Sequence, residues 1–183
     1  MSKLSLFDSL FLKLENSEIP AHIAVLQIYQ LPRGKGSAWL HKLISKLREY
    51  PPGTPFNHRL RPNRESRPEF IEDENFDIDY HLRHTVLPKP GNEEQLRNVV
   101  ARLHGNLMDR DRPLWEFHLI EGLEGRRFAF YIKIHHAICD GATFSKWMSQ
   151  STGTEPDGNT PPIWARPRRH AGHTERPWLE TLQ

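Results

Sequence analysis

Apolar residues spaced three or four positions apart predict four helices, because this spacing places their side chains on one face of a helix. One stripe runs over residues 4–14 and a shorter one over residues 142–148. The two clearest stripes are Leu40, Leu43, Ile44 and Leu47, and Leu96, Val99, Val100, Leu103 and Leu107. Ser37 is the expected N-cap of the first of these two helices, and Asn92 with Gln95 forms a capping-box pattern before the second.

Strands are predicted where apolar and less apolar residues alternate, most clearly over residues 127–134. Residues 115–120 form a second strand, and the turn EGLEGRR between the two predicts a hairpin. Residues 22–29 are apolar on both faces, which predicts a central strand. Short extended pieces are expected around Phe70 and over residues 82–87.

The expected elements all lie within residues 1–150, which predicts one α/β domain there. Its expected architecture is a two-layer sandwich, a mixed sheet with helices on one face. Residues 151–183 hold five of the 15 prolines and three glycines without any apolar period, so a disordered linker is expected. Residues 51–68 hold another five prolines and are expected to form a long polar loop.

Composition sets the broad class of the protein. Of the 183 residues, 37% are hydrophobic and 26% are charged, as is usual for a soluble domain, and a net charge of +2 gives no reason to expect nucleic acid as a partner. A single cysteine and the absence of a signal peptide or a long apolar run predict a cytoplasmic protein. Attachment to a membrane surface or to lipid inclusions stays open.

An acidic cluster precedes the third long helix. It consists of Glu72, Asp73, Glu74, Asp77 and Asp79. The cluster lacks the glycine and the terminal glutamate of a calcium-binding loop. We therefore expect solvated turn residues there, and no metal site.

The sequence HHAICDG follows the clearest strand, at a turn where a rigid scaffold commonly carries chemistry. Adjacent histidines on an extended backbone point to opposite faces, so His135 and His136 do not easily share one metal ion. Cys139 has no evident orienting partner for a role as nucleophile. A neutral imidazole acting as general base fits better, although a buried, hydrogen-bonded histidine is the commoner case. Asp140 is expected to cap the next helix or to pair with an arginine, and Gly141 to permit close backbone approach.

HHAICDG resembles the HHxxxDG motif of the CoA-dependent acyltransferase superfamily, which peptide-synthetase condensation domains share. The resemblance to the N-terminal part of bacterial wax ester synthase/diacylglycerol acyltransferases covers nearly all of residues 4–148. It includes LSLFDSLFLKLE, IPAHIAVLQIY, PPGTPFNHRLR, FIEDENFDIDYHLRHTVLPKPG and DRDRPLWEFHLIEGLEGRRFAFYIKIHHAICDG. PLWE, about twenty residues before the histidines, makes the likeness more specific.

The resemblance implies a chloramphenicol-acetyltransferase-like half and an O-acyltransferase. His136 would be the general base for direct transfer of a long-chain acyl group from acyl-CoA to a fatty alcohol or diacylglycerol. His135, Asp140 and Gly141 would support the motif loop, and no cofactor is implied, since acyl-CoA is a substrate. The second motif, Pro113, Leu114, Trp115 and Glu116, would bind substrate; alternatively, Trp115 packs beneath the site.

Family members carry a second, similar half that closes a channel over the histidine. The C-terminal half of the same enzyme is therefore an expected partner, and this chain alone is expected to be inactive. Two other functions stay open, a condensation-type domain using carrier-protein thioesters and a non-catalytic module that binds lipid or a partner. Both acceptors also stay open, because acceptor selectivity depends on the shape of the pocket.

Overall fold

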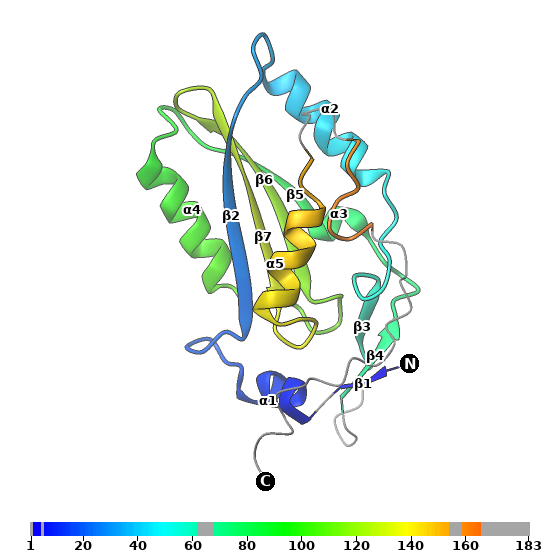
Figure 1. Cartoon of the computed structure of the whole chain (residues 1–183). Helices are drawn as coiled ribbons and strands as arrows, with labels where there is room; N and C mark the ends of the chain where they lie inside the picture. Colours follow the sequence, from blue (N-terminus) through cyan, green and yellow to red (C-terminus); the bar gives the residue numbers. More distant parts are fainter. Residues whose placement is uncertain (1, 5, 62–67, 154–158, 166–183) are drawn as a thin grey trace.

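The computed structural model describes residues 2–4, 6–61, 68–153 and 159–165. Strands and helices are interspersed along the chain (Figure 1). In chain order they are β1 (Ser2–Lys3), α1 (Leu6–Leu14), β2 (His22–Gln30), α2 (Ser37–Arg48), β3 (His58–Leu60), β4 (Glu69–Glu72), α3 (Ile78–His81), β5 (Leu82–Val86), α4 (Glu93–Gly105), β6 (Trp115–Leu123), β7 (Arg127–His135) and α5 (Gly141–Gln150). The four predicted helices, the hairpin and the extended pieces are confirmed.

A four-stranded mixed sheet in the order β2-β7-β6-β5 forms the centre of the molecule. β7 is antiparallel to both of its neighbours, whereas β5 is parallel to β6. The register places Trp115 opposite Ile134 and His22 opposite His135. The starts of β6 and β2 therefore flank the end of β7, where the histidine turn begins. A smaller antiparallel sheet, β1-β4-β3, lies beyond this end (Figure 1).

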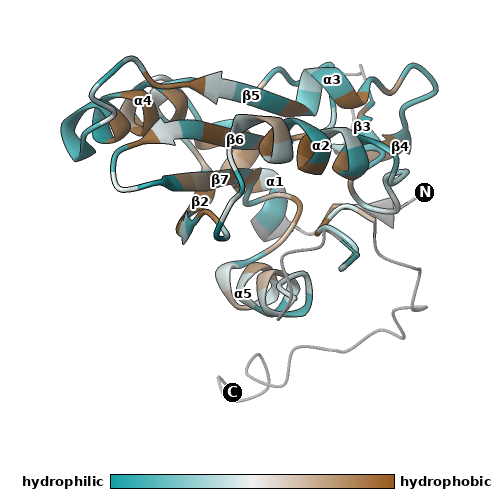
Figure 2. Cartoon of the chain, turned by 90° about the horizontal axis from the view of Figure 1, so that it is seen from above, coloured by the Kyte–Doolittle hydropathy of each residue, from teal (hydrophilic) through white to brown (hydrophobic). Residues whose placement is uncertain are grey.

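Helices cover both faces of the central sheet, so the prediction of a single covered face is wrong. On one face, Leu96 of α4 packs against Ile120, Ala129 and Tyr131. On the other face, residues of α2 and α5 join a larger core with the opposite side chains of β6 and β7. That core includes Leu40, Ile44, Leu47, Phe144, Met148, Phe117, Leu119, Phe128 and Ile132. Figure 2 shows apolar, brown segments on β7, α2 and α4. The near-continuous burial of β6 and β7 is the physical sign of a sheet covered twice.

β2 is an edge strand, which corrects the prediction of a central one. Among the described residues it pairs only with β7. Ala24 packs against the core under α4, but Leu26 and Ile28 further along the same face remain 40% and 45% exposed. An apolar sequence on both faces does not tell whether a neighbour covers each side chain.

The start of α2 also differs from the prediction. Gly36 occupies the N-cap position and makes no side-chain hydrogen bond to the helix, while Ser37 is the first helical residue. The Ser37 hydroxyl instead donates to Glu121 on β6. The capping box of Asn92 and Gln95 on α4 is confirmed in full.

Two predicted irregular regions contain ordered structure. The polar loop expected over residues 51–68 includes β3, while residues 62–67 of it lie outside the described part. The acidic stretch includes the short helix α3, whose N-cap Asp77 accepts a hydrogen bond from the N–H of Asp79. Asp79 pairs with Arg48 at 2.7 Å, and the buried Asp73 lies 3.5 Å from Arg59. These acidic residues hold turns and pair with arginines.

Part of the expected linker packs into the core. Ile163 and Trp164 are buried, and the Trp164 ring stacks on Trp115 at 5.4 Å between centroids. Trp164 also donates its indole N–H to the carbonyl of Tyr50. The linker prediction is therefore wrong for residues 159–165, because two large side chains without any period still fill a gap over Trp115. Residues 154–158 and 166–183 lie outside the described part. No described helix has the length and apolarity that a membrane crossing requires.

Candidate active site

The histidine turn is fixed on both sides by backbone hydrogen bonds. The N–H of His135 donates to the carbonyl of Leu114, which precedes β6, at 3.0 Å. The N–H of His136 donates to the carbonyl of Ala21, which precedes β2, at 2.9 Å. The turn thus lies in a frame made by three strand ends, and PLWE, distant in sequence, directly adjoins the histidines.

His135 is completely buried, with a hydrogen bond at its Nδ1 and a carboxylate beside its Nε2. Its Nδ1 accepts a hydrogen bond from the N–H of Ala137 at 2.9 Å, so Nδ1 carries no proton. Its Nε2 lies 3.4 Å from Oε1 of Glu15, whose side chain is also buried. In its neutral form the ring therefore carries its proton on Nε2, facing the carboxylate. This arrangement orients the turn and gives a solvent-borne substrate no access to the ring.

Glu15 is the centre of a small network that links α1 to the turn. Its carboxylate accepts hydrogen bonds from Arg110 at 3.0 Å and from the N–H of Ala21 at 3.3 Å. Arg110 also donates to the carbonyl of Leu12, at 2.6 Å. Burial by itself would raise the pKa of Glu15, but the adjacent His135 ring and the hydrogen bond from Arg110 outweigh it and lower the pKa to about 2.

Neither Glu15 nor Arg110 was predicted as a site residue. Glu15 ends an amphipathic helix, and Arg110 belongs to a charged run 95 residues later. No local pattern connects the two positions, because the pairing depends on where the sheet brings α1 and the segment before β6.

His136 differs from its neighbour because its ring is only partly buried. It stacks on Phe11 of α1, with 4.7 Å between ring centroids and 14° between planes. Burial lowers its pKa, and the nearby His135 lowers it further, whereas the negative charge of Asp140 acts in the opposite direction. The ring is therefore neutral at neutral pH, as a proton acceptor must be.

The rest of the motif shapes the start of α5. Asp140 is its N-cap and accepts a hydrogen bond from the N–H of Thr143 at 2.8 Å, so the expected capping role is observed. Gly141 has no described atom within 4 Å of where a Cβ would lie, so the expected close backbone approach is not found within the described chain. Burial raises the pKa of the Cys139 thiol to about 12, which makes it a poor nucleophile.

The second motif, Pro113 to Glu116, is buried in its entirety. Leu114 packs with Ala137 of the turn, and Trp115 donates its indole N–H to Phe56 at 2.8 Å while stacking on His81. Glu116 points to the opposite face of the sheet from Trp115. Trp115 is thus packed in the core on the strand that adjoins the turn, while a role of the four residues in substrate binding stays a prediction.

Glu116 is part of a buried polar cluster beneath α4. Its carboxylate lies 3.0 Å from the Nε2 of His118 and 3.4 Å from the Nζ of Lys133. Lys133 also donates to two carbonyls at the end of α4, those of Leu103 and Asn106. The cluster holds the end of α4 against the sheet, and the pKa of Glu116 falls to about 2 because the His118 hydrogen bond and the Lys133 charge outweigh its burial.

A cavity of about 390 Å³ lies on the face of the sheet under α2 and α5. Its wall is mostly aromatic and aliphatic. The wall includes Tyr29, Trp39, Leu43, Leu47, Phe117, Phe128, Phe130, Ile132, Met148 and Ile163. Ile132 lies on β7 four residues before His136, roughly 13 Å along an extended strand. The cavity therefore lies beside the strand that carries the histidine turn.

Sequence comparison identifies several curated relatives. A putative diacylglycerol O-acyltransferase of Mycobacterium tuberculosis is 39% identical over 165 residues, which is 86% of this chain and 32% of the relative. The O-acyltransferase WSD of Acinetobacter baylyi is 37% identical over 82% of this chain and 32% of its own length. The chain spans about a third of each of these relatives.

Solved structures give the same grouping. The wax ester synthase/diacylglycerol acyltransferase from Marinobacter aquaeolei superimposes with a TM-score of 0.82 at 39% identity, over 89% of this chain and 41% of that one. A condensation domain of the calcium-dependent antibiotic synthetase superimposes with a TM-score of 0.57 at 21% identity, which shows a shared fold alone. Residues 4–181 match the model of the wax ester synthase/diacylglycerol acyltransferase catalytic domain. The chain therefore belongs to the wax ester synthase/diacylglycerol acyltransferase family.

Proposed function

We propose that this chain supplies the general base of an O-acyltransferase that moves a long-chain acyl group from acyl-CoA to a fatty alcohol or diacylglycerol. The observation that carries the proposal is the contrast within the histidine pair. His135 is enclosed by Glu15 and Ala137, while the adjacent His136 keeps a partly exposed ring whose pKa is lowered by burial. A fixed neutral imidazole at the rim of the turn is the arrangement that general-base catalysis requires.

The proposed reaction is a direct transfer. The ring of His136 accepts the proton of the acceptor hydroxyl. The oxygen of that hydroxyl then attacks the carbonyl carbon of the thioester. The tetrahedral intermediate collapses with cleavage of the C–S bond, and the leaving CoA sulfur takes the proton from the imidazolium. An ester and free CoA are formed, the base is regenerated, and no cofactor enters the step.

The surrounding motif residues position this base. His135, tied to Glu15, holds one side of the turn, and Asp140 holds the other by capping α5. Leu114 and Trp115 form the floor beneath it through the Leu114 carbonyl and the buried indole. In this scheme Pro113 to Glu116 affect the substrate through the shape of the floor.

The mostly apolar cavity supports a long-chain substrate. Its volume of about 390 Å³ falls in the range of small-molecule pockets, and its aromatic and aliphatic wall suits a hydrocarbon chain. Its position beside β7 would let a chain extend away from the histidine turn. A fatty alcohol and a diacylglycerol both carry such a chain, so the cavity suits either acceptor.

The greater length of the matched relatives indicates which partner this chain needs. The matched relatives carry further sequence beyond the third to two-fifths that this chain covers. We propose that a C-terminal portion of the kind these relatives carry completes the site and excludes water from it. A condensation-type reaction is less favoured, because the condensation domains compared share at most 21% identity with this chain.

The test is ester formation from palmitoyl-CoA with hexadecanol or dioleoylglycerol. It uses the 183-residue chain alone and the chain joined to the C-terminal part of the Marinobacter relative. We expect activity in the joined protein, and a His136→Gln variant should lose it by roughly 10²- to 10⁴-fold, the usual contribution of a general base. His58→Gln, a histidine change on β3 in the smaller sheet, should leave the rate unchanged.

Circular dichroism must show that the His136→Gln protein remains folded. A folded His136→Gln protein with the parent rate would refute the assignment of the base. Transfer from an acyl-carrier protein in preference to palmitoyl-CoA would favour the condensation-type alternative. CoA-independent lipid binding with no turnover in the joined protein would favour a non-catalytic module.

A further inference from the structure

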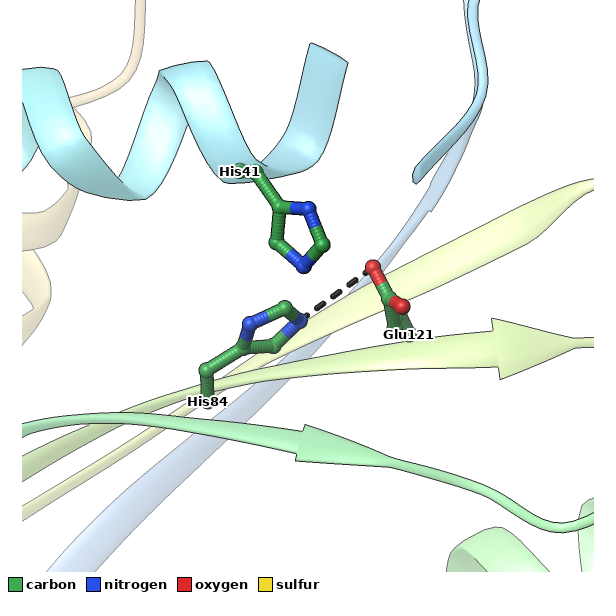
Figure 3. A group of neighbouring side chains, drawn as sticks. All are labelled: His41, His84 and Glu121. Atoms are coloured by element: carbon green, nitrogen blue, oxygen red, sulfur yellow. Dashed lines mark ion pairs between the residues drawn. The ribbon is translucent and has the colours of Figure 1, made fainter. Parts of the chain in front are cut away.

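Two histidines and a glutamate meet between α2 and the sheet, away from the histidine turn (Figure 3). His41 comes from α2, His84 from β5 and Glu121 from β6. One ligand atom of each residue lies within 4.8 Å of the other two. Along β6, Glu121 is six residues beyond Trp115, so this cluster is roughly 20 Å along the strand from the turn.

The donor atoms suit a transition metal ion. Two imidazole nitrogens and one carboxylate oxygen are a common protein ligand set for Zn²⁺, which then keeps a fourth position for water. With metal–ligand distances of about 2.1 Å, a tetrahedral ion places neighbouring ligand atoms about 3.4 Å apart. The Nε2 of His84 and the Oε2 of Glu121 are already 3.2 Å apart. His41 is exposed, so its ring is free to make the small approach that remains.

A second observation concerns the direction in which the His84 ring points. Its Nε2 is buried, yet it makes no hydrogen bond of acceptable geometry with any described residue, although a carboxylate oxygen is 3.2 Å away. Figure 3 shows this nitrogen and one nitrogen of His41 facing the same space beside Glu121. A buried nitrogen without a hydrogen bond has a cost that a bound ion would remove.

The surroundings hold the carboxylate in place. The hydroxyl of Ser37 donates to both oxygens of Glu121, at 3.0 and 3.2 Å. Such a contact is typical of ligating carboxylates, whose orientation is set by the groups behind them. His84 and Glu121 also lie on adjacent, parallel strands, which keeps the two ligands at a constant separation.

We propose that His41, His84 and Glu121 form a binding site for a divalent transition metal ion, with Zn²⁺ as the expected occupant. The ion would join α2 to β5 and β6. Because Trp39, Leu43 and Leu47 of the same helix line the cavity, the ion would also fix one wall of it. The role is structural, and it does not depend on the acyl-transfer chemistry proposed for the turn.

The test is calorimetric titration of the metal-depleted 183-residue chain with ZnCl₂. We expect one ion per chain. His41→Ala and His84→Ala should each weaken binding by at least roughly 100-fold, and Ser37→Ala by roughly 10-fold, since groups behind a ligand contribute 10- to 100-fold. The matched control His58→Ala removes a histidine outside the cluster and should bind as the parent chain does. Zn²⁺ should raise the unfolding temperature of the parent and not that of His41→Ala, because only ligands of the folded state stabilise it.

His41 is exposed, so its alanine variant is expected to fold, and circular dichroism checks this. Unchanged zinc affinity in the folded His41→Ala chain would overturn the proposal. So would binding of several ions with none lost in either variant, which would indicate scattered surface histidines. The absence of any binding by the parent chain would leave Glu121 and His84 as a simple ion pair and would also overturn it.

Discussion

At one end of the central sheet Glu15 holds His135, whereas at the other end Glu121 lies beside His84 and His41. At the turn, the carboxylate also receives Arg110 and a backbone N–H. At the far end, the additional neighbours are the hydroxyl of Ser37 and a second imidazole that solvent reaches. The same residue types therefore stand in a closed cluster at one end and an open one at the other.

The difference shows how donors and acceptors decide the use of a histidine. Around Glu15, a guanidinium and a backbone N–H both donate to one buried carboxylate, which also lies beside the His135 ring, so the cluster serves to fix a loop. Around Glu121, the serine hydroxyl donates to the carboxylate, while one nitrogen of His84 and one of His41 face the same space and can serve as ligands for a cation. The closed cluster around Glu15 suits a structural support for His136. The open cluster around Glu121 suits the binding of a metal ion.

The largest expected stability effect lies in the main core at the start of β6, where Trp164 stacks on Trp115. Trp164→Ala should lower the free energy of unfolding by about 3–5 kcal/mol, because it leaves a cavity in the main core. Denaturant unfolding of the chain measures this loss. Trp39→Ala, on the partly buried cavity wall, is the matched control and should lose less. An unchanged unfolding free energy in Trp164→Ala would mean that residues 159–165 do not pack on the core.

A smaller effect is expected from breaking the closed cluster. Glu15→Ala leaves a guanidinium N–H of Arg110 and the backbone N–H of Ala21 without their acceptor, which should cost about 2 kcal/mol. Without metal, Glu121→Ala at the open end should cost about 1 kcal/mol, since the hydroxyl of Ser37 loses its acceptor. Equal losses in the two variants, measured by denaturant unfolding, would remove the distinction between the ends.

The low pKa of Glu15 predicts how the stability of the chain depends on acidic pH. Its pKa is about 2 in the folded chain against an ordinary value of 4.5, so the folded state disfavours its protonation. The stability that Glu15 contributes is fully present above pH 4.5 and is lost as pH falls from 4.5 to 2. Glu15→Gln should remove this part of the acid dependence, and the parent curve is its reference.

The periodicity of the sequence predicts most of the helices and strands, but it does not predict which of them pack together. The helical stripes, the capping box of α4 and the hairpin are local patterns, and each is confirmed. The edge position of β2 and the second covered face were predicted wrongly, because both depend on which elements pack together over long distances. Trp164 gave no signal either, since a single aromatic residue among prolines has no period.

The candidate site also contains residues that the sequence predicts and residues that it does not. The motif placed His135, His136 and Asp140 correctly at the end of a strand and the start of a helix. The network of Glu15 and Arg110 was not predicted, because its members come from segments joined only by the folded sheet. Spacing likewise gave no indication that His41 and His84 meet at Glu121.

The most direct test of the histidine turn is an NMR titration of its two rings in ¹⁵N-labelled chain. We expect His136 to titrate below its ordinary pKa of 6.5, and thus to be neutral at pH 7. We also expect neutral His135 to carry its proton on Nε2, because its Nδ1 accepts the N–H of Ala137. Assignment uses His135→Gln and His136→Gln. A His136 pKa above 6.5, or a proton on Nδ1 of His135, would contradict the proposal that Glu15 fixes one histidine so that its neighbour serves as a neutral base.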